Sequence, residues 1–217
     1  MNMFTTQIEP HDTFAIFYSH MTLFNTISIC LSRDMWHYTS IAYFKQKTKK
    51  GEVGSSTMPH KVNPIDFENC EGNLGMANSL MNHFRDKLPI SRLQRDLSDS
   101  TVMRNHGVAL GYSQVGYKSL LKGLDKIDVN SEIINEDLDS HWEVLAEPIQ
   151  MLLRKLGVEN PYEKLKDLTR GEKVTKELLA NFINSCEIDE ANKKYLLNLS
   201  PQNYIGKAAS LVNHKKP

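Results

Sequence analysis

The side chains best suited to chemistry in this chain gather in residues 54–64, which have the sequence GSSTMPHKVNP. Hydroxyls, a cation and an amide stand there among glycine and proline residues, a composition that favours a loop over regular structure. Pro64 is well placed as the first residue of a helix, so Asn63 is the predicted N-cap. A polar loop that runs into the positive end of a helix suits an anionic ligand. A helix-start loop whose polar side chains only cap backbone groups is the alternative from spacing alone.

A second polar group lies in residues 91–105, with the sequence SRLQRDLSDSTVMRN. Three guanidinium groups and two hydroxyls stand near the start of a predicted helix, a combination that binds the phosphate of a nucleoside monophosphate. These groups belong to Arg92, Arg95, Ser100, Thr101 and Arg104. The alternative is an ordinary helix cap with salt bridges from Asp96 and Asp99, and the residues alone leave both open.

The histidines and cysteines predict neither a metal site nor a disulfide framework. Cys30, Cys70 and Cys186 are odd in number and far apart, which favours a reducing compartment. Metal-ligand spacing is absent among the histidines outside residues 54–64, so scattered polar or partly buried side chains are expected at His11, His20, His37, His83, His106, His141 and His214. We expect no metal and no cofactor.

Composition indicates a globular protein and argues against a nucleic-acid partner. The chain has 217 residues, of which 40% are hydrophobic and 24% charged, and 26 basic residues balance 26 acidic ones. Polar residues interrupt the apolar stretch 14–31, so it is a poor transmembrane span, and the amino terminus lacks the pattern of a signal peptide. We therefore expect a cytoplasmic protein without a membrane partner.

Three long helices must position the two polar groups. Apolar side chains at helical spacing predict a long, mostly buried helix from Asp12 to about Phe44, a second from Pro64 to about Arg85 and a third from about Asp99 to Leu124. Long helices joined by a functional loop indicate a bundle.

The character of the chain changes near Lys126, where the predicted helices become short. We place a domain boundary there, giving domains 1–126 and 127–217. Downstream, Thr175 and Asp189 are predicted N-caps and Gly157 is predicted to end a helix. No alternating pattern is long enough to build a sheet, so the expected fold is all-α, a long-helix bundle followed by a small C-terminal helical domain.

Residues 54–64 look like the signature loop of the fumarase and aspartase superfamily of lyases. Their MPHKVNP version resembles the adenylosuccinate lyases of bacterial type, and residues 5–12 (TTQIEPHD) and 91–105 narrow the resemblance to that family. The similarity continues towards the end of the chain, through residues 142–150, 161–171 and 203–206. The resemblance supports the bundle and implies a fold shared with that superfamily.

The resemblance implies β-elimination of fumarate from adenylosuccinate to give AMP, and from the related nucleotide SAICAR to give AICAR. Ser55 is implied to be the catalytic base, and Lys61 and Asn63 to grip the carboxylate of the succinyl part. His60 is expected to tune or bind, not to act as the acid. The implied substrate-binding residues are Gln7, Lys61, Val62, Asn63, Asn69, Arg95, Ser100, Thr101, Val102, Met103 and Arg104.

The match begins only at Thr5, whereas a complete enzyme of this family needs roughly as many residues again upstream. The missing part would supply the general acid, and the family is implied to build its site from three subunits of a homotetramer. We therefore expect negligible activity from this chain alone. Argininosuccinate lyase, fumarase and a catalytically silent helical module that keeps only assembly or nucleotide binding are the alternatives.

Overall fold

The computed structural model describes residues 3–47, 63–161, 163, 165–166 and 174–213, and it is built almost entirely of helices. The chain forms two compact units, residues 1–130 and 131–217. The all-α prediction is confirmed.

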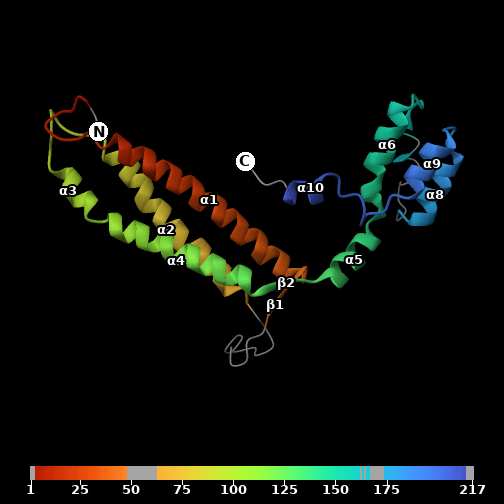
Figure 1. The fold of residues 1–217 in the computed structure, drawn as a ribbon, viewed down its shortest axis with the longest axis horizontal. Coiled ribbons are helices and arrows are strands. Elements are labelled where there is room, and N and C mark those ends of the chain that lie inside the picture. Colours follow the sequence, from red (N-terminus) through yellow and green to blue (C-terminus); the bar gives the residue numbers. More distant parts are fainter. Residues whose placement is uncertain (1–2, 48–62, 162, 164, 167–173, 214–217) are drawn as a thin grey trace. The chain divides into compact units, whose positions relative to one another are not determined.

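Three long helices make up most of the first unit and lie side by side (Figure 1). Its elements are α1 (Asp12–Ser40), β1 (Phe44–Gln46), α2 (Ile65–Lys87), α3 (Ser98–Met103), α4 (His106–Asp125) and β2 (Ile127–Val129). The two strands pair antiparallel, with Lys45 opposite Asp128. The start of helix α2 lies by this two-stranded ribbon, and the end of helix α2 lies near the start of α1 (Figure 1).

Helix α2 is the centre of this bundle, because it packs against both α1 and α4. Its buried side chains recur at steps of three and four residues, as on one stripe of a helix; they are Phe67, Cys70, Leu74, Ala77, Met81 and Phe84. Helix α4 approaches this stripe at two glycines. A Cβ at Gly116 would lie 2.6 Å from Leu74 Cδ2, and one at Gly123 would lie 2.9 Å from Phe67 Cε1. Side chains at these two positions would push the helices apart.

A polar network crosses the bundle. The Asn25 amide of α1 donates to Asn78 Oδ1 of α2 at 2.9 Å and to Ser113 Oγ of α4 at 3.2 Å. The Tyr117 hydroxyl donates to the Asn25 carbonyl oxygen. Because a buried amide is costly unless it is hydrogen-bonded, these contacts favour one register of the three helices.

The prediction that the first helix is mostly buried is wrong. Helix α1 buries Tyr18, Asn25, Ser28 and Ser32, so most of its buried side chains are polar. Its large apolar side chains are exposed instead, among them Phe14, Ile16, Phe17, Leu23, Phe24, Ile27 and Leu31. The apolar face of α1 is wider than the surface that α2 and α4 cover within this chain.

The boundaries differ from the prediction at three places. Helix α1 ends at Ser40, short of the predicted end at about Phe44, and Phe44 begins β1. The predicted helix from Asp99 to Leu124 is broken between α3 and α4, where the N–H of Asn105 donates to the Val102 carbonyl and its side chain donates to the Thr101 carbonyl. An asparagine that bonds to the preceding turn competes with continued helix. Asn63 is not the N-cap of α2: Pro64 holds that position, and no side chain caps the helix.

A buried ion pair holds the start of α2 against the end of α4. The Asp66 carboxylate lies 2.9 Å from Lys122 Nζ and 3.0 Å from Lys126 Nζ, and both Asp66 and Lys126 are buried. Burial alone would raise the pKa of Asp66, but hydrogen bonds and charge from the two lysines outweigh it and hold the pKa below 3.8. The backbone carbonyl of Lys126 also accepts the N–H of Lys47 at 2.6 Å. Lys126 thus contacts the chain on both sides of residues 48–62.

The second unit consists of short helices around their own apolar core. They are α5 (Ser131–Ser140), the 3₁₀ turn η1 (Trp142–Leu145), α6 (Ala146–Lys155), α8 (Lys176–Ser185), α9 (Glu190–Leu197) and α10 (Ala208–Val212). The core includes Leu145, Ile149, Leu153, Leu179, Phe182, Ile183 and Leu196.

The predicted helix ends in this unit are confirmed. Thr175 accepts the N–H of Leu178, and Asp189 accepts the N–H of Asn192. Gly157 has a φ of 78° and follows α6, whose last turn it closes by donating to the Arg154 carbonyl. These signals depend on a few neighbouring residues, which is why the sequence alone contained them.

Helix α1 is long and apolar enough to cross a membrane by length and composition alone, with a mean hydropathy of 1.4 over its most apolar window. It nevertheless packs along α2 and turns Asn25, Ser28 and Ser32 towards its neighbours. Its exposed apolar side chains thus share one helix with polar side chains that face the bundle. Within the described part of the chain, no three His, Cys, Asp or Glu side chains form a group that could hold a metal ion.

We predict that Asp66→Asn lowers the free energy of unfolding by about 3 kcal/mol at pH 7, because it removes the carboxylate partner of a buried lysine. Lys122→Met is the matched control and should cost less than about 1 kcal/mol, since Lys122 is 60% exposed. Urea denaturation measures both.

The same contribution has a defined pH dependence. Because the pKa of Asp66 is lowered from 3.8, the stabilisation is complete above about pH 4 and is lost as the pH falls through the lowered pKa. The difference between Asp66→Asn and wild type should shrink only below about pH 4. A difference that is already absent at pH 6 would contradict the role of the ion pair.

Candidate functional site

The predicted site residues that the structure describes fall into two groups at opposite ends of α2. Ser55, Lys61 and Val62, with His60, lie outside the described residues. Asn63 and Asn69 lie at the start of α2, and both are exposed. The others lie after the end of α2 or, for Gln7, just before α1; they are Gln7, Arg95, Ser100, Thr101, Val102, Met103 and Arg104.

The length of α2 separates these groups. The helix has 23 residues, which at 1.5 Å per residue span about 34 Å. That length exceeds the reach of a single small ligand. Within this chain, therefore, the structure does not bring Asn63 and Asn69 together with Arg95 and its neighbours.

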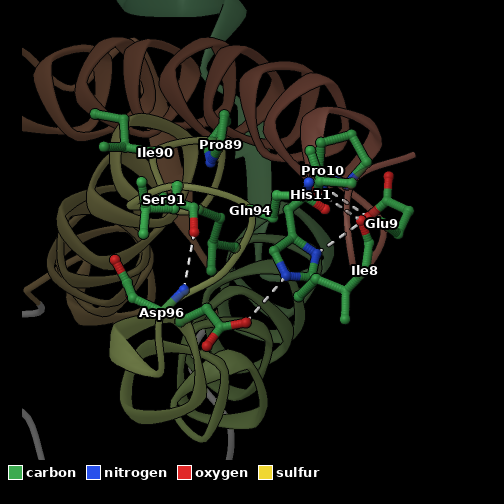
Figure 2. A pocket seen from close by; sticks show the side chains of 13 residues that line it. Ile8, Glu9, Pro10, His11, Pro89, Ile90, Ser91, Gln94 and Asp96 are labelled. Carbon is green, nitrogen blue, oxygen red and sulfur yellow. Dashed lines mark hydrogen bonds and ion pairs between the residues drawn. The ribbon is translucent and has the colours of Figure 1, made fainter. Parts of the chain in front are cut away.

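The structure does bring together the two motifs at residues 5–12 and 91–105, which are about ninety positions apart in sequence. They line a pocket of about 150 Å³ beside the start of α1 (Figure 2). Glu9, His11 and Ile8 line it from one motif, and Ser91, Gln94 and Asp96 from the other. Gln7 stands between two residues, Thr6 and Ile8, that line the same pocket.

His11 joins the two motifs, and the sequence analysis missed it. The residue is buried, with 8% of its surface exposed, and its backbone is left-handed with a φ of 62° at the N-cap of α1. Its Nδ1 lies 3.1 Å from Glu9 Oε2 and its Nε2 lies 3.4 Å from Asp99 Oδ2 (Figure 2). Glu9 also accepts the backbone N–H of His11 at 2.8 Å. The sequence could have indicated the contact of His11 with Glu9, because the two residues are two positions apart. It contains no signal for the contact with Asp99, which is 88 positions away.

Asp96 organises the segment before α3. Its carboxylate accepts the N–H of Ser98 at 2.8 Å, the Ser98 hydroxyl, and the N–H and Nε of Arg92 at 3.1 and 3.3 Å. The hydrogen bonds from Ser98, aided by those from Arg92, hold the pKa of Asp96 well below its usual range against a small effect of burial. The salt bridge of the helix-cap alternative is thus present between Asp96 and Arg92, whereas the N-cap of α3 is Leu97, which makes no side-chain cap hydrogen bond.

Arg95 and Arg104 differ from Arg92. Both are exposed, and among the residues that the structure describes neither guanidinium makes an ion pair or a hydrogen bond. Ser100 is half-buried and Thr101 is exposed, both in α3 between the two arginines. Two exposed cations and two hydroxyl side chains thus stand within ten positions of one another along the chain, in and next to α3.

Val102 and Met103 point elsewhere. Their side chains pack against the buried cluster that contains Tyr18 and Phe84. Because these side chains are used in packing, only the backbone of Val102 and Met103 is left for contact with a ligand.

His106 packs near His11 without joining its contacts. Its ring lies against Phe14, Tyr18 and Phe84, with centroids 5.0 to 5.4 Å apart. Burial, and to a lesser extent the charge of His11, lowers the pKa of His106. Its Nε2 is buried and has no hydrogen-bond partner in the described part of the chain. The surroundings are those of a neutral packing side chain.

Two family models together match most of the chain. The model described as "Adenylosuccinate lyase C-terminal" matches residues 91–205, and the model described as "Lyase" matches residues 1–78.

Curated proteins of high similarity carry one name. The adenylosuccinate lyase of Buchnera aphidicola (subsp. Acyrthosiphon pisum) is 56% identical over 212 residues, which are 98% of this chain and 46% of that protein. The adenylosuccinate lyase of Escherichia coli K12 is 54% identical over 215 residues, which are 99% of this chain and 47% of that protein. The chain therefore spans about half the length of the curated relatives it matches.

Solved structures share the fold. A 3-carboxy-cis,cis-muconate lactonizing enzyme from Pseudomonas putida matches 92% of this chain and 46% of its own, with a TM-score of 0.70 and 21% identity. A fumarate lyase:delta crystallin from Brucella melitensis matches 85% of this chain and 39% of its own, with a TM-score of 0.60 and 16% identity. At these identities the likeness concerns the fold. The matches in sequence, at 54% and 56% identity over nearly the whole chain, identify the family as well as the fold. The chain belongs to the adenylosuccinate lyase family.

Proposed function

We propose that this chain forms part of an adenylosuccinate lyase, which eliminates fumarate from adenylosuccinate to leave AMP and from SAICAR to leave AICAR in purine nucleotide biosynthesis. The observation that carries the proposal is identity of 54% and 56% to two bacterial adenylosuccinate lyases over nearly the whole chain. On this proposal the protein is a carbon–nitrogen lyase that acts in the cytoplasm, without a cofactor.

The nucleotide end of the substrate is assigned to the group after α2. Arg95 and Arg104 are exposed cations without an ion pair among the described residues, and Ser100 and Thr101 add hydroxyl donors between them. Charged donors of this kind suit the phosphate of a nucleoside monophosphate. Gln7, which carries an amide, stands in sequence between Thr6 and Ile8, and these two residues line the pocket beside the start of α1 together with Gln94 and Asp99.

The reacting end of the substrate is assigned to the group around the start of α2. The proton to be removed lies next to a carboxylate, so negative charge accumulates on an already anionic group in the transition state. Ser55 is proposed as the base, and Lys61, Val62, Asn63 and Asn69 as ligand contacts. Asn63 supports this assignment because its side chain is exposed and does not cap α2.

The separation of the two groups supports an assembly of several copies, which we propose is a homotetramer. Since about 34 Å of helix lie between Asn63 at one end and Arg95 beyond the other, a ligand that meets both is proposed to draw them from different copies of the chain. The exposed apolar faces of α1 and α4 give such copies a surface to bury, because exposed patches of this kind mark interfaces. On this proposal residues 1–126 belong to the central bundle and residues 127–217 form a small helical domain.

Turnover on this proposal needs residues that the curated relatives have and this chain does not span. The general acid is among them. We therefore propose that this chain by itself has negligible activity, and both tests below use a full-length protein that contains it.

We predict that Arg95→Ala weakens AMP and adenylosuccinate binding by about tenfold or more, because a charge-assisted hydrogen bond to phosphate is worth about 1.5–3 kcal/mol. Fumarate has no phosphate, so its affinity should change little. Calorimetric titration with the three ligands measures this, with Arg154→Ala as the matched control at an exposed arginine of the second unit. Equal loss for all three ligands would contradict the phosphate assignment.

We predict that Ser55→Ala lowers kcat for adenylosuccinate by about a thousandfold or more while AMP still binds, since loss of a general base removes about two to four orders of magnitude. Ultraviolet absorbance follows the cleavage. Turnover equal to wild type would rule out Ser55 as the base. Wild-type cleavage of another fumarate adduct, with none of adenylosuccinate, would favour argininosuccinate lyase or fumarase activity.

A further inference from the structure

A buried carboxylate lies directly beside the proposed phosphate site. Asp99 precedes Ser100, is 8% exposed, and accepts the N–H of Ser100 at 2.7 Å through its Oδ1. An ionised carboxylate at this position repels a phosphate, and the repulsion is strong where water is excluded. A phosphate can bind at Ser100 only if the charge of Asp99 is offset.

Within the described part of the chain, no lysine or arginine forms an ion pair with Asp99. The side chain that meets Asp99 from another element is His11, whose Nε2 lies 3.4 Å from Asp99 Oδ2. The opposite ring nitrogen, Nδ1, lies 3.1 Å from Glu9 Oε2. Ionised carboxylates only accept hydrogen bonds, so both contacts are complete only when both ring nitrogens carry a proton, which is the cationic form of histidine.

The position of the ring is fixed from several sides. His11 begins α1 with a left-handed backbone, its N–H donates to Glu9, and its ring lies 5.9 Å from that of Phe14. Beyond Phe14 stands His106, whose ring centroid is 5.4 Å from Phe14. The carboxylates of Glu9 and Asp99 contact His11 directly. Asp96 lines the same pocket (Figure 2), and His106 lies beyond Phe14.

We propose that His11 is a positioning residue for nucleotide binding, which holds the Asp99 carboxylate and offsets its charge so that Ser100, Thr101 and Arg95 can accept a phosphate. The inference rests on the proposed function, because it takes the phosphate of AMP as the ligand. His11 itself does not touch the ligand. It acts through Asp99, and it also ties the segment that carries Gln7 to the start of α3.

The competing account is that His11 only ties these two segments together. The two accounts differ in the effect of removing both charges. If His11 is only a structural tie, removing Asp99 as well restores nothing. If His11 offsets a charge, removing that charge makes His11 dispensable for phosphate binding.

The test compares His11→Asn, Asp99→Asn and the double variant in a full-length protein, by calorimetric titration with AMP and with adenosine. Asparagine is chosen because it tolerates the φ of 62° at position 11. We expect His11→Asn to weaken AMP by about tenfold, the effect of one poorly screened charge, and to leave adenosine nearly unchanged. Asp99→Asn should bind AMP at least as tightly as wild type, and the double variant should recover most of the affinity. His83→Asn, at an exposed histidine of α2, is the matched control.

Two results would overturn the inference: a double variant that binds AMP as weakly as His11→Asn, or equal losses for AMP and adenosine. A wild-type protein that binds no AMP would refute the proposed nucleotide site instead. In that case inorganic phosphate replaces AMP as the probe. The inference then requires that His11→Asn binds phosphate more weakly than the wild type, Asp99→Asn and the double variant do. Failure to bind phosphate at all would refute both proposals.

Discussion

Helix α2 sets the distance on which the functional account depends. It runs between α1 and α4 and is closely packed, because a Cβ at Gly116 or Gly123 of α4 would meet Leu74 or Phe67 of its buried stripe. The helix is about 34 Å long, and predicted site residues lie at both of its ends. Within this chain a helix of that length keeps Asn63 and Asn69 apart from Arg95 and its neighbours, and this separation is the basis for proposing that one site uses more than one copy of the chain.

Near each end of α2 a buried carboxylate meets a basic side chain from another element. At the start, Asp66 is held by Lys126 from the end of α4. After the end, Asp99 meets His11 from the start of α1. Buried charges are costly to leave unpaired, so each pair favours one arrangement of the segments around it. Between them, Asn25 does the same for the middle of the bundle with neutral hydrogen bonds. The bundle therefore has polar contacts along its whole length that are sensitive to register.

Local signals in the sequence predicted local structure well. Thr175, Asp189 and Gly157 act through neighbours within five residues, and their roles at helix ends are confirmed. The burial of α1 was misjudged because apolar periodicity does not say which chain covers an apolar face. Asn63 failed as an N-cap because Pro64 took that position. The contact of His11 with Asp99 joins residues far apart in sequence, and no local pattern in a single sequence predicts such a contact. The roles of the substrate-binding residues came from a family resemblance, and they stay predictions.

The central claim is that one site draws its base from one copy of the chain and its phosphate contacts from another. Mixing full-length Ser55→Ala and Arg95→Ala proteins tests it directly after the subunits have been dissociated and reassembled together, at low adenylosuccinate, where the first is inactive and the second keeps about a tenth or less of wild-type turnover. If the two groups come from different copies, about a quarter of the sites are intact in a random mixture, and at least that share of wild-type turnover returns. If both groups come from the same copy, every site keeps one lesion, and the turnover of the mixture does not exceed that of Arg95→Ala alone.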